Sequence, residues 1–365
     1  MESKSPVLYL HIGVHRTGTT SIQEYLHRNQ QRFLDEGVLI AFGQGRPYRQ
    51  AELVRNRLTT SEELGRDILT QLRNKNGAAN KVIFSEEDIC QITEPELFAG
   101  LRSQFDVKVV IFLRRQDQWL ESWFQQNIKA QWNLELAHIG FAEFLRLAET
   151  NKFHWINYQS LVTNWSKVFG SENILLRVME RPQMPHGPVQ EFLQLIGCDK
   201  LYSPKLDSHK NASFSPQVSE FLRHLPLDGL QKKQVKAFIL AAAGAISRGM
   251  DDRGVSILSP QQRHEILDRY FDGNQWVARD YFGRERLFDD DLSQPHINWP
   301  ELASDESIAL LNNVAGPMIL QVAKEASKWQ KKAKSRRRSL VASRSHNSKS
   351  YHVKAFFRLL FGQEE

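Results

Sequence analysis

The ten residues from His11 to Thr20, HIGVHRTGTT, decide which kind of fold this chain can form. An apolar run from Val7 to Ile12 leads into them, and a segment with helical hydrophobic spacing follows them. This order predicts a buried strand, a glycine-containing loop and the start of a helix. Gly13 and Gly18 can adopt backbone angles that other residues disfavour, and they leave amide N–H groups uncovered. The loop is therefore suited to holding an anion at the positive end of the helix dipole.

The same loop supplies hydroxyl groups and a cation. Thr17, Thr19 and Thr20 carry hydroxyls near the expected helix start, and Arg16 carries a permanent charge. A triphosphate-binding loop of the GxxxxGK[ST] type has a lysine directly after its second glycine, whereas Thr19 follows Gly18 here. The missing lysine weakens the prediction of a nucleotide kinase and keeps the prediction of an anion site.

A strand followed by an Arg-Thr-Gly-Thr-Thr loop resembles the 5′-phosphosulfate loop of bacterial sulfotransferases, which use 3′-phosphoadenosine 5′-phosphosulfate as donor. The usual residue at the position of Arg16 is Lys in that family, so this chain departs from the commonest form. The resemblance implies an α/β fold of the P-loop NTPase type, with a parallel sheet flanked by helices and, here, a helical C-terminal part. It also implies that the loop binds the donor through Gly13, His15, Arg16, Thr17, Gly18, Thr19 and Thr20, with Arg16 also acting in catalysis.

A second motif runs from Val107 to Lys129, where a continuous apolar strand leads directly into an amphipathic helix. Arg114 lies at the strand exit, and Ser122 follows eight residues later. Both side chains can face one anion, the Arg with a planar fork of donors and the Ser with a hydroxyl. The sulfotransferase resemblance implies that this pair binds the 3′-phosphate of the donor. Arg115 takes the place of Arg114 if the register shifts by one residue.

Three acidic residues follow the predicted strand Lys81–Ser85. One possibility is structural: Ser85 could cap a helix, and the negative charges of Glu86, Glu87 and Asp88 could stabilise the positive end of its dipole. Alternatively, one carboxylate is a general base. In the cytosolic branch of the sulfotransferases a His occupies the position that matches Glu86, so the resemblance implies that Glu86 is the base, with Glu87 as second candidate.

Other elements complete the predicted domain. We expect a helix from Thr20 to Glu36 and a strand from Ile174 to Val178. Trp119 and Trp123 have helical spacing, which favours core packing over stacking on a ligand. A mobile basic loop closes over the nucleotide in sulfotransferases, and the candidates for that role here are Lys210, Asn211 and Ser213.

We predict three segments: a sulfotransferase-like domain over 1–290, a helical extension over 291–327 and a basic tail over 328–365. The net charge of +6 comes from eleven Lys and Arg residues in the tail, because 37 basic and 42 acidic residues remain without them. The tail has the composition of a partly disordered linker. Its final segment, YHVKAFFRLLFG over 351–362, suits either a short amphipathic helix on an anionic membrane or a helix docked on the domain's own core.

The expected function is transfer of a sulfuryl group to a hydroxyl acceptor, with carbohydrate as the first expectation, and without a metal ion. The alternatives are a nucleotide or small-molecule kinase and a non-catalytic protein that binds nucleotide or glycan with the same fold. The chain has only two cysteines, which fits a reducing compartment. Residues 1–6 contain no apolar leader, and no apolar run is long enough to cross a membrane, so we expect a cytoplasmic protein. The expected partners are a small-molecule or glycan acceptor and, through the tail, a membrane surface, and we expect no nucleic acid.

Overall fold

The computed structural model describes both predicted catalytic residues, Arg16 and Glu86, and most of the predicted donor-binding residues. The loop with Lys210, Asn211 and Ser213 and the basic tail over 328–365 lie outside the described residues. The description covers residues 5–42, 47–74, 79–130, 133–206, 216–225, 235, 255–289, 291–299, 305–322 and 325.

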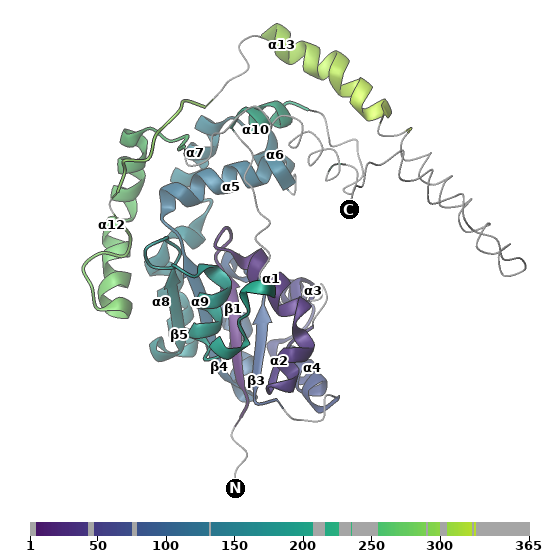
Figure 1. The fold of residues 1–365 in the computed structure, drawn as a ribbon, viewed down its shortest axis with the longest axis vertical. Coiled ribbons are helices and arrows are strands. Elements are labelled where there is room, and N and C mark those ends of the chain that lie inside the picture. Colours follow the sequence, from purple (N-terminus) through teal and green to yellow (C-terminus); the bar gives the residue numbers. More distant parts are fainter. Residues whose placement is uncertain are drawn as a thin grey trace, which may run out of the picture. The chain divides into compact units, whose positions relative to one another are not determined.

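A five-stranded sheet forms the centre of the fold, with the strand order β2-β3-β1-β4-β5 and every neighbouring pair parallel (Figure 1). Parallel pairing requires a crossover between successive strands, and helices supply it here. The predicted α/β class with a parallel sheet flanked by helices is therefore confirmed. The strands are β1 (Val7–Gly13), β2 (Val38–Ile40), β3 (Lys81–Ser85), β4 (Asp106–Leu113) and β5 (Ile174–Val178).

The central strands are buried on both faces. Every residue of β4 from Val109 to Leu113 is fully buried, as are Leu8, Leu10 and Ile12 of β1. Such uninterrupted apolar runs are what a parallel strand between two helical layers requires. Because burial on both faces requires an uninterrupted apolar run, these strands could be located from the sequence.

Helices form a core on one face of the sheet. Ile22 of α1, Phe33 of α2 and Phe192 of α9 belong to one cluster of buried side chains with Val110 and Phe112 of β4. Elsewhere, Trp165 of α8 packs against Phe98 of η2. The helices of this first half are α1 (Thr19–Arg28), α2 (Gln30–Asp35), α3 (Pro47–Arg55), α4 (Ser61–Asn74), η1 (Glu87–Gln91), η2 (Pro95–Ser103), α5 (Gln116–Ala130), α6 (Leu134–His138) and α7 (Phe141–Glu149).

The remaining helices follow β4 in sequence and continue to the end of the described chain. The 23-residue helix α12 (Pro260–Phe282) has a capping box at its N-cap Ser259 and Gly283 as its C-cap. The others are η3 (His154–Ile156), α8 (Tyr158–Phe169), η4 (Ser171–Asn173), α9 (Gly187–Leu195), η5 (Asp199–Leu201), η6 (Pro204–Leu206), α10 (Pro216–Arg223), α13 (Asp305–Leu310) and η8 (Leu311–Ala315).

The helix predicted from Thr20 to Glu36 is wrong as one element, because α1 and α2 are separate helices divided at Asn29. The backbone N–H of Asn29 and its side-chain Nδ2 both donate to the carbonyl of Tyr25, over 3.2 and 2.8 Å. Asn29 has φ −109° and ψ 13°, outside the α-helical range, and its side-chain bond to the preceding turn favours such a break.

The chain divides into two compact units. The first comprises Met1–Arg223 and Ile246–Glu301 and contains the whole sheet. The second comprises His224–Ala245 and Leu302–Glu365, and its described part includes α13 and the π-helical turn η8. The predicted boundaries at residues 290 and 327 stay predictions. Among the helices that the structure describes, none combines the length and hydrophobicity needed to cross a membrane.

Candidate active site

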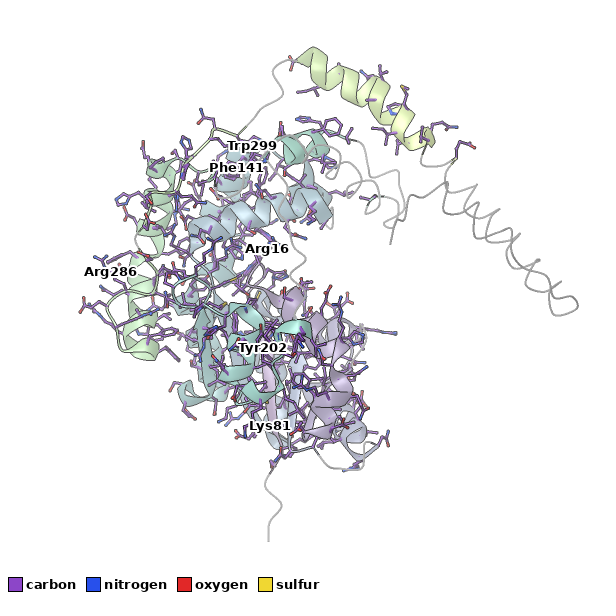
Figure 2. The ribbon with its side chains drawn as sticks, viewed as in Figure 1. Arg16, Lys81, Phe141, Tyr202, Arg286 and Trp299 are labelled. Atoms are coloured by element: carbon purple, nitrogen blue, oxygen red, sulfur yellow. The ribbon has the colours of Figure 1, made fainter. Side chains whose placement is uncertain are left out.

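The predicted site residues gather at the carboxyl edge of three neighbouring strands. The loop after β1 carries Arg16, Glu86 follows β3 directly, and Arg114 follows β4 directly. Figure 2 places Arg16 beneath α5, whereas Lys81, at the start of β3, lies at the other end of the sheet. Ligands of open α/β sheets bind at the carboxyl ends of the strands. The arrangement thus brings the two separate sequence motifs to one place.

Glycine is required where the loop enters α1. Gly18 is the N-cap of α1 and has a φ angle of 83°. A Cβ at this position would lie only 2.5 Å from the Cβ of Pro188. Arg16 also has a positive φ angle, 63°, which is uncommon for a residue with a side chain. These two positive φ angles shape the turn that leads into the N-terminus of α1, the kind of position at which proteins bind anions.

The three threonines of the loop differ in environment. Thr17 is fully buried, and its hydroxyl donates to the carbonyl of Val14. Thr19 is also buried, whereas Thr20 is exposed. The Thr17 hydroxyl thus closes the loop on itself, and the Thr20 hydroxyl is the one that faces solvent.

Arg16 connects the loop to α5. Its Nε donates to Ser122 Oγ over 2.8 Å, and its Nη1 donates to Gln126 Oε1 over 2.9 Å. Arg114 Nη1 donates to the carbonyl of Arg16 over 3.0 Å. The structure therefore joins Arg16, Arg114 and Ser122, which were predicted from two distant motifs. Gln126 was not predicted, although its position four residues after Ser122 on one helix face was a usable signal.

The guanidinium groups of Arg16 and Arg114 lie close together in the partly buried loop region of the candidate site. Burial, and next the neighbouring Arg114, lower the pKa of Arg16 to about 10, so Arg16 stays charged at neutral pH. Burial also lowers the pKa of Arg114. Within the described residues, neither side chain forms an ion pair with a carboxylate. A bound anion would relieve both the desolvation and the mutual repulsion.

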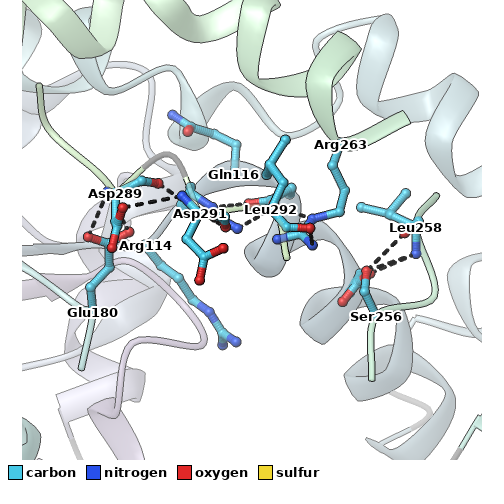
Figure 3. A network of polar contacts seen from close by, with 12 residues as sticks. Arg114, Gln116, Glu180, Ser256, Leu258, Arg263, Asp289, Asp291 and Leu292 are labelled. Atoms are coloured by element: carbon cyan, nitrogen blue, oxygen red, sulfur yellow. Dashed lines mark hydrogen bonds and ion pairs between the residues drawn. The ribbon is translucent and has the colours of Figure 1, made fainter. Parts of the chain in front are cut away.

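Arg115 points elsewhere. Its Nε and Nη2 donate to the two carboxylate oxygens of Asp117, over 2.9 and 3.0 Å, and Arg263 binds the same buried carboxylate. Arg115 Nη1 also donates to the carbonyls of Asp289 and Asp291. In Figure 3 the Arg114 side chain points away from Asp289 and Asp291. Of the two candidates at the strand exit, Arg114 faces the loop and Arg115 supports the fold.

We therefore expect Arg115→Lys to destabilise the protein by roughly 1 to 3 kcal/mol while leaving anion binding unchanged. Lysine cannot reproduce the planar fork, so the buried Asp117 and two carbonyls lose donors. Urea unfolding measures the stability, and Arg32→Lys at an exposed position of α2 is the matched control. A weakened affinity for adenosine 3′,5′-bisphosphate at unchanged stability would contradict this assignment.

Glu86 is buried, and the pKa of its carboxyl group is well above the ordinary value. Burial, and next the charge of Glu87, raise the pKa of Glu86 to about 8. Its carboxylate accepts from the backbone N–H of Asp88 over 3.2 Å and caps η1. Glu86, not Ser85, is thus the cap, and the Ser85 hydroxyl instead contacts His11 Nδ1 at 2.8 Å. A carboxyl group with this pKa can accept a proton near neutral pH.

The His15 side chain turns away from the loop toward η1. Its Nε2 lies 2.8 Å from Asp88 Oδ1, and its Nδ1 lies 3.5 Å from Cys90 Sγ. A thiol, an imidazole and a carboxylate in this order occur in thiol hydrolases. Burial, however, raises the pKa of Cys90 well above its ordinary value, which disfavours the nucleophilic thiolate. The group therefore positions the loop rather than supplying a nucleophile.

Trp119 and Trp123 pack in the core, as predicted. Trp119 is fully buried, and its ring stacks on Trp123 with centroids 5.5 Å apart. Trp119 Nε1 donates to the carbonyl of His15 over 2.7 Å. These rings hold the loop in place. Within the described residues, no three His, Cys, Asp or Glu side chains are grouped as metal ligands.

No family model matches the sequence. A relative from Archaeoglobus fulgidus, described as an uncharacterized protein, is 28% identical over 193 residues, which make up 50% of this chain and 47% of that relative. The match thus spans about half the length of the curated relative.

The chain is similar in structure to two bacterial sulfotransferases. The sulfotransferase from Alicyclobacillus acidocaldarius matches 67% of this chain and 97% of its own, with 15% identity and a TM-score of 0.38. The sulfotransferase domain of the Synechococcus PCC 7002 olefin synthase matches 69% of this chain and 98% of its own, with 13% identity and a TM-score of 0.29.

Proposed function

We propose that this protein transfers a sulfuryl group from 3′-phosphoadenosine 5′-phosphosulfate to a hydroxyl acceptor. One observation carries the proposal: Arg16 and Arg114, from two distant motifs, meet at a helix N-terminus without a carboxylate partner in the described part of the chain. Two such cations fit a donor with several negative groups. The sequence resemblance of both motifs to sulfotransferases supports this donor over other anions.

The residues present fit the two ends of that donor. Arg16 and the backbone of the loop would hold the 5′-phosphosulfate at the start of α1. Arg114 and Ser122 would hold the 3′-phosphate, and Ser122 would then exchange its hydrogen bond with Arg16 for one with phosphate. Gln126 would keep one contact to Arg16 during that exchange.

The proposed reaction forms one bond and breaks one. The acceptor oxygen bonds to sulfur, and the bond between sulfur and the bridging oxygen of the 5′-phosphate breaks. Glu86 takes the acceptor proton, and adenosine 3′,5′-bisphosphate leaves. Arg16 would stabilise the charge that develops on the bridging oxygen. The chain contributes alignment, a base and a cation, and we expect no requirement for a metal ion.

A comparison of two donors tests the function. The protein is incubated with labelled 3′-phosphoadenosine 5′-phosphosulfate or labelled ATP and a panel of hydroxylated acceptors, with and without a chelator. Transfer of label from the phosphosulfate donor, unaffected by the chelator, is the expected result. Transfer from ATP alone would identify a kinase. Donor binding without transfer to any acceptor would favour a non-catalytic binding protein.

We expect Arg114→Ala and Ser122→Ala to weaken binding of adenosine 3′,5′-bisphosphate more than binding of adenosine 5′-phosphate. Each change deletes a contact to the 3′-phosphate, and the charged contact should cost more than the neutral one. Calorimetric titration of both variants with both ligands measures the difference. Equal losses for the two ligands would show that the 3′-phosphate site is misassigned.

The acceptor and the location are further parts of this proposal. We propose carbohydrate as the acceptor class, a cytoplasmic site of action, and peripheral membrane contact through the basic tail over 328–365. A membrane contact would bring the enzyme close to a lipid-linked sugar.

A further inference from the structure

One buried phenol holds the backbone of Arg114. The Tyr158 hydroxyl donates to the carbonyl of Arg114 and accepts from the Arg114 N–H over 3.1 Å. The pairing of β4 with its neighbouring strands ends one residue earlier, at Leu113, so the sheet offers no partner to these two groups. Backbone N–H and carbonyl groups away from water need hydrogen-bond partners. Tyr158 therefore supplies from α8 the hydrogen bonds that the sheet no longer provides.

Tyr158 itself has a fixed position. It is the first residue of α8, and the N-cap of that helix is Asn157. The Tyr158 ring is buried and packs against Phe288, with ring centroids 6.1 Å apart. Burial raises the pKa of Tyr158, so the hydroxyl keeps its proton and can donate. Just before α8, the carbonyl of Ile156 accepts from Gln116 Nε2 over 3.2 Å, which fixes the start of α8 against the connection between β4 and α5.

The Arg114 side chain joins this connection to the loop after β1. Its Nη1 donates to the carbonyl of Arg16 over 3.0 Å, and its other two guanidinium nitrogens make no hydrogen bond within the described residues. The Arg16 side chain in turn donates to Ser122 over 2.8 Å. Because a guanidinium is a planar fork of donors, its alignment with an anion depends on where its backbone is held. The hydroxyl of Tyr158 thus controls the placement of a donor group that it does not touch.

We propose that Tyr158 is a positioning residue that sets the selectivity for the 3′-phosphate of the donor. The identity of the ligand rests on the proposed function, whereas the contact between Tyr158 and Arg114 does not. Without the hydroxyl, the N–H and carbonyl of Arg114 lose their shared partner, and the end of β4 can shift. The guanidinium then meets the 3′-phosphate in poorer geometry. The 5′-phosphate, held by the loop, should be affected less.

Selectivity between two nucleotides tests this role. Full-length wild type and Tyr158→Phe are titrated by calorimetry with adenosine 3′,5′-bisphosphate and with adenosine 5′-phosphate. Tyr158→Phe keeps the ring that packs against Phe288 and removes only the hydroxyl. We expect the ratio of the two affinities to fall about tenfold, which is the order of effect for a misaligned contact between charged groups. Melting temperatures confirm that each variant is folded.

Two further variants separate positioning from a general effect on α8. Tyr281→Phe is the matched control, because the Tyr281 hydroxyl also contacts α8, at Ser166 Oγ over 2.8 Å, and not Arg114. It should leave the affinity ratio unchanged. In the Arg114→Ala background, addition of Tyr158→Phe should lower the ratio no further, because Tyr158 acts through the Arg114 guanidinium.

The outcomes distinguish this inference from the proposed function. An unchanged ratio in Tyr158→Phe, an equal fall in Tyr281→Phe, or a further fall when Tyr158→Phe is added to Arg114→Ala would overturn the positioning role. If wild type binds neither nucleotide, the sulfotransferase assignment falls, and inorganic pyrophosphate becomes the probe. Weaker pyrophosphate binding by Tyr158→Phe than by wild type and Tyr281→Phe would then support the role of Tyr158. Equal binding by all three, or none, would overturn it.

Discussion

Arg16→Ala should lower the rate of sulfuryl transfer by two or more orders of magnitude, whereas Arg16→Lys should retain much of it. Removing one donor that stabilises developing charge costs about 3 to 4 kcal/mol in comparable sites. Lysine keeps a charge and is the usual residue at this position in the family that the loop resembles. It would lose the two separate contacts of Nε and Nη1 to Ser122 and Gln126, so a modest loss is expected.

Single-turnover measurements with saturating donor separate this loss of rate from a loss of donor affinity. Arg28→Ala is the control, because Arg28 lies at the exposed end of α1, the helix that follows the loop, and is paired with Glu24. It should leave the rate unchanged. Near-normal turnover of Arg16→Ala would remove Arg16 from the catalytic machinery.

Glu86→Gln should reduce transfer by 10²- to 10⁴-fold, the usual contribution of a general base, and should leave affinity for adenosine 3′,5′-bisphosphate intact. The glutamine keeps the shape and can still cap η1 through its carbonyl. Wild-type turnover should rise with pH up to about 8, because only the ionised carboxyl group accepts a proton and its pKa is about 8. This rise should be absent from the residual activity of Glu86→Gln.

Glu87→Gln identifies the base by comparison. The Glu87 carboxylate accepts a hydrogen bond from Gln23 of α1, so one of its oxygens is already occupied by this contact. A loss of turnover in Glu87→Gln as large as that in Glu86→Gln, with the pH profile changed in the same way, would mean that Glu86 is not the specific base.

The raised pKa of Glu86 also makes stability depend on pH. In the unfolded chain the carboxyl group ionises near its ordinary pKa of 4.5, whereas in the folded protein it stays protonated until about pH 8. The unfolded state thus binds fewer protons between these values, and this group's contribution to stability falls as pH rises through that window. The melting temperature of Glu86→Gln relative to wild type should accordingly increase from pH 5 to pH 8.

The strands were predictable because burial on both faces leaves an uninterrupted apolar run. The predicted spans Lys81–Ser85 and Ile174–Val178 agree with β3 and β5 residue for residue. The break at Asn29 was missed, because hydrophobic spacing alone cannot distinguish one helix from two helices in line. Local hydrogen bonding by a single side chain decides that difference.

The candidate site was predictable only in part. The composition of the loop and the spacing of Arg114 and Ser122 predicted one shared site, and the structure joins Arg16, Arg114 and Ser122 by hydrogen bonds. The direction of His15 could not be predicted, because its partner Asp88 lies 73 residues away in the sequence. The same is true of the choice between Arg114 and Arg115, since contacts with Asp289 and Asp291 decide it. Side chains that depend on distant partners are set by tertiary packing, which spacing does not encode.

Two carboxylates of α5, Asp117 and Glu121, depend on residues far along the chain and so limit how far the C-terminus can be shortened. Asp117 is 1% exposed and needs Arg263 of α12, and Glu121 accepts from Ser256 and the backbone of Ile257 and Leu258. A fragment ending after α10 would leave Asp117 with Arg115 but without Arg263, and would remove Ser256, Ile257 and Leu258 from Glu121. Gene truncations for expression should therefore retain the chain through at least residue 292, whose carbonyl also contacts Arg263. We therefore expect the smallest autonomous folding unit to extend past the last strand of the sheet, as far as the segments that pair with these two acids.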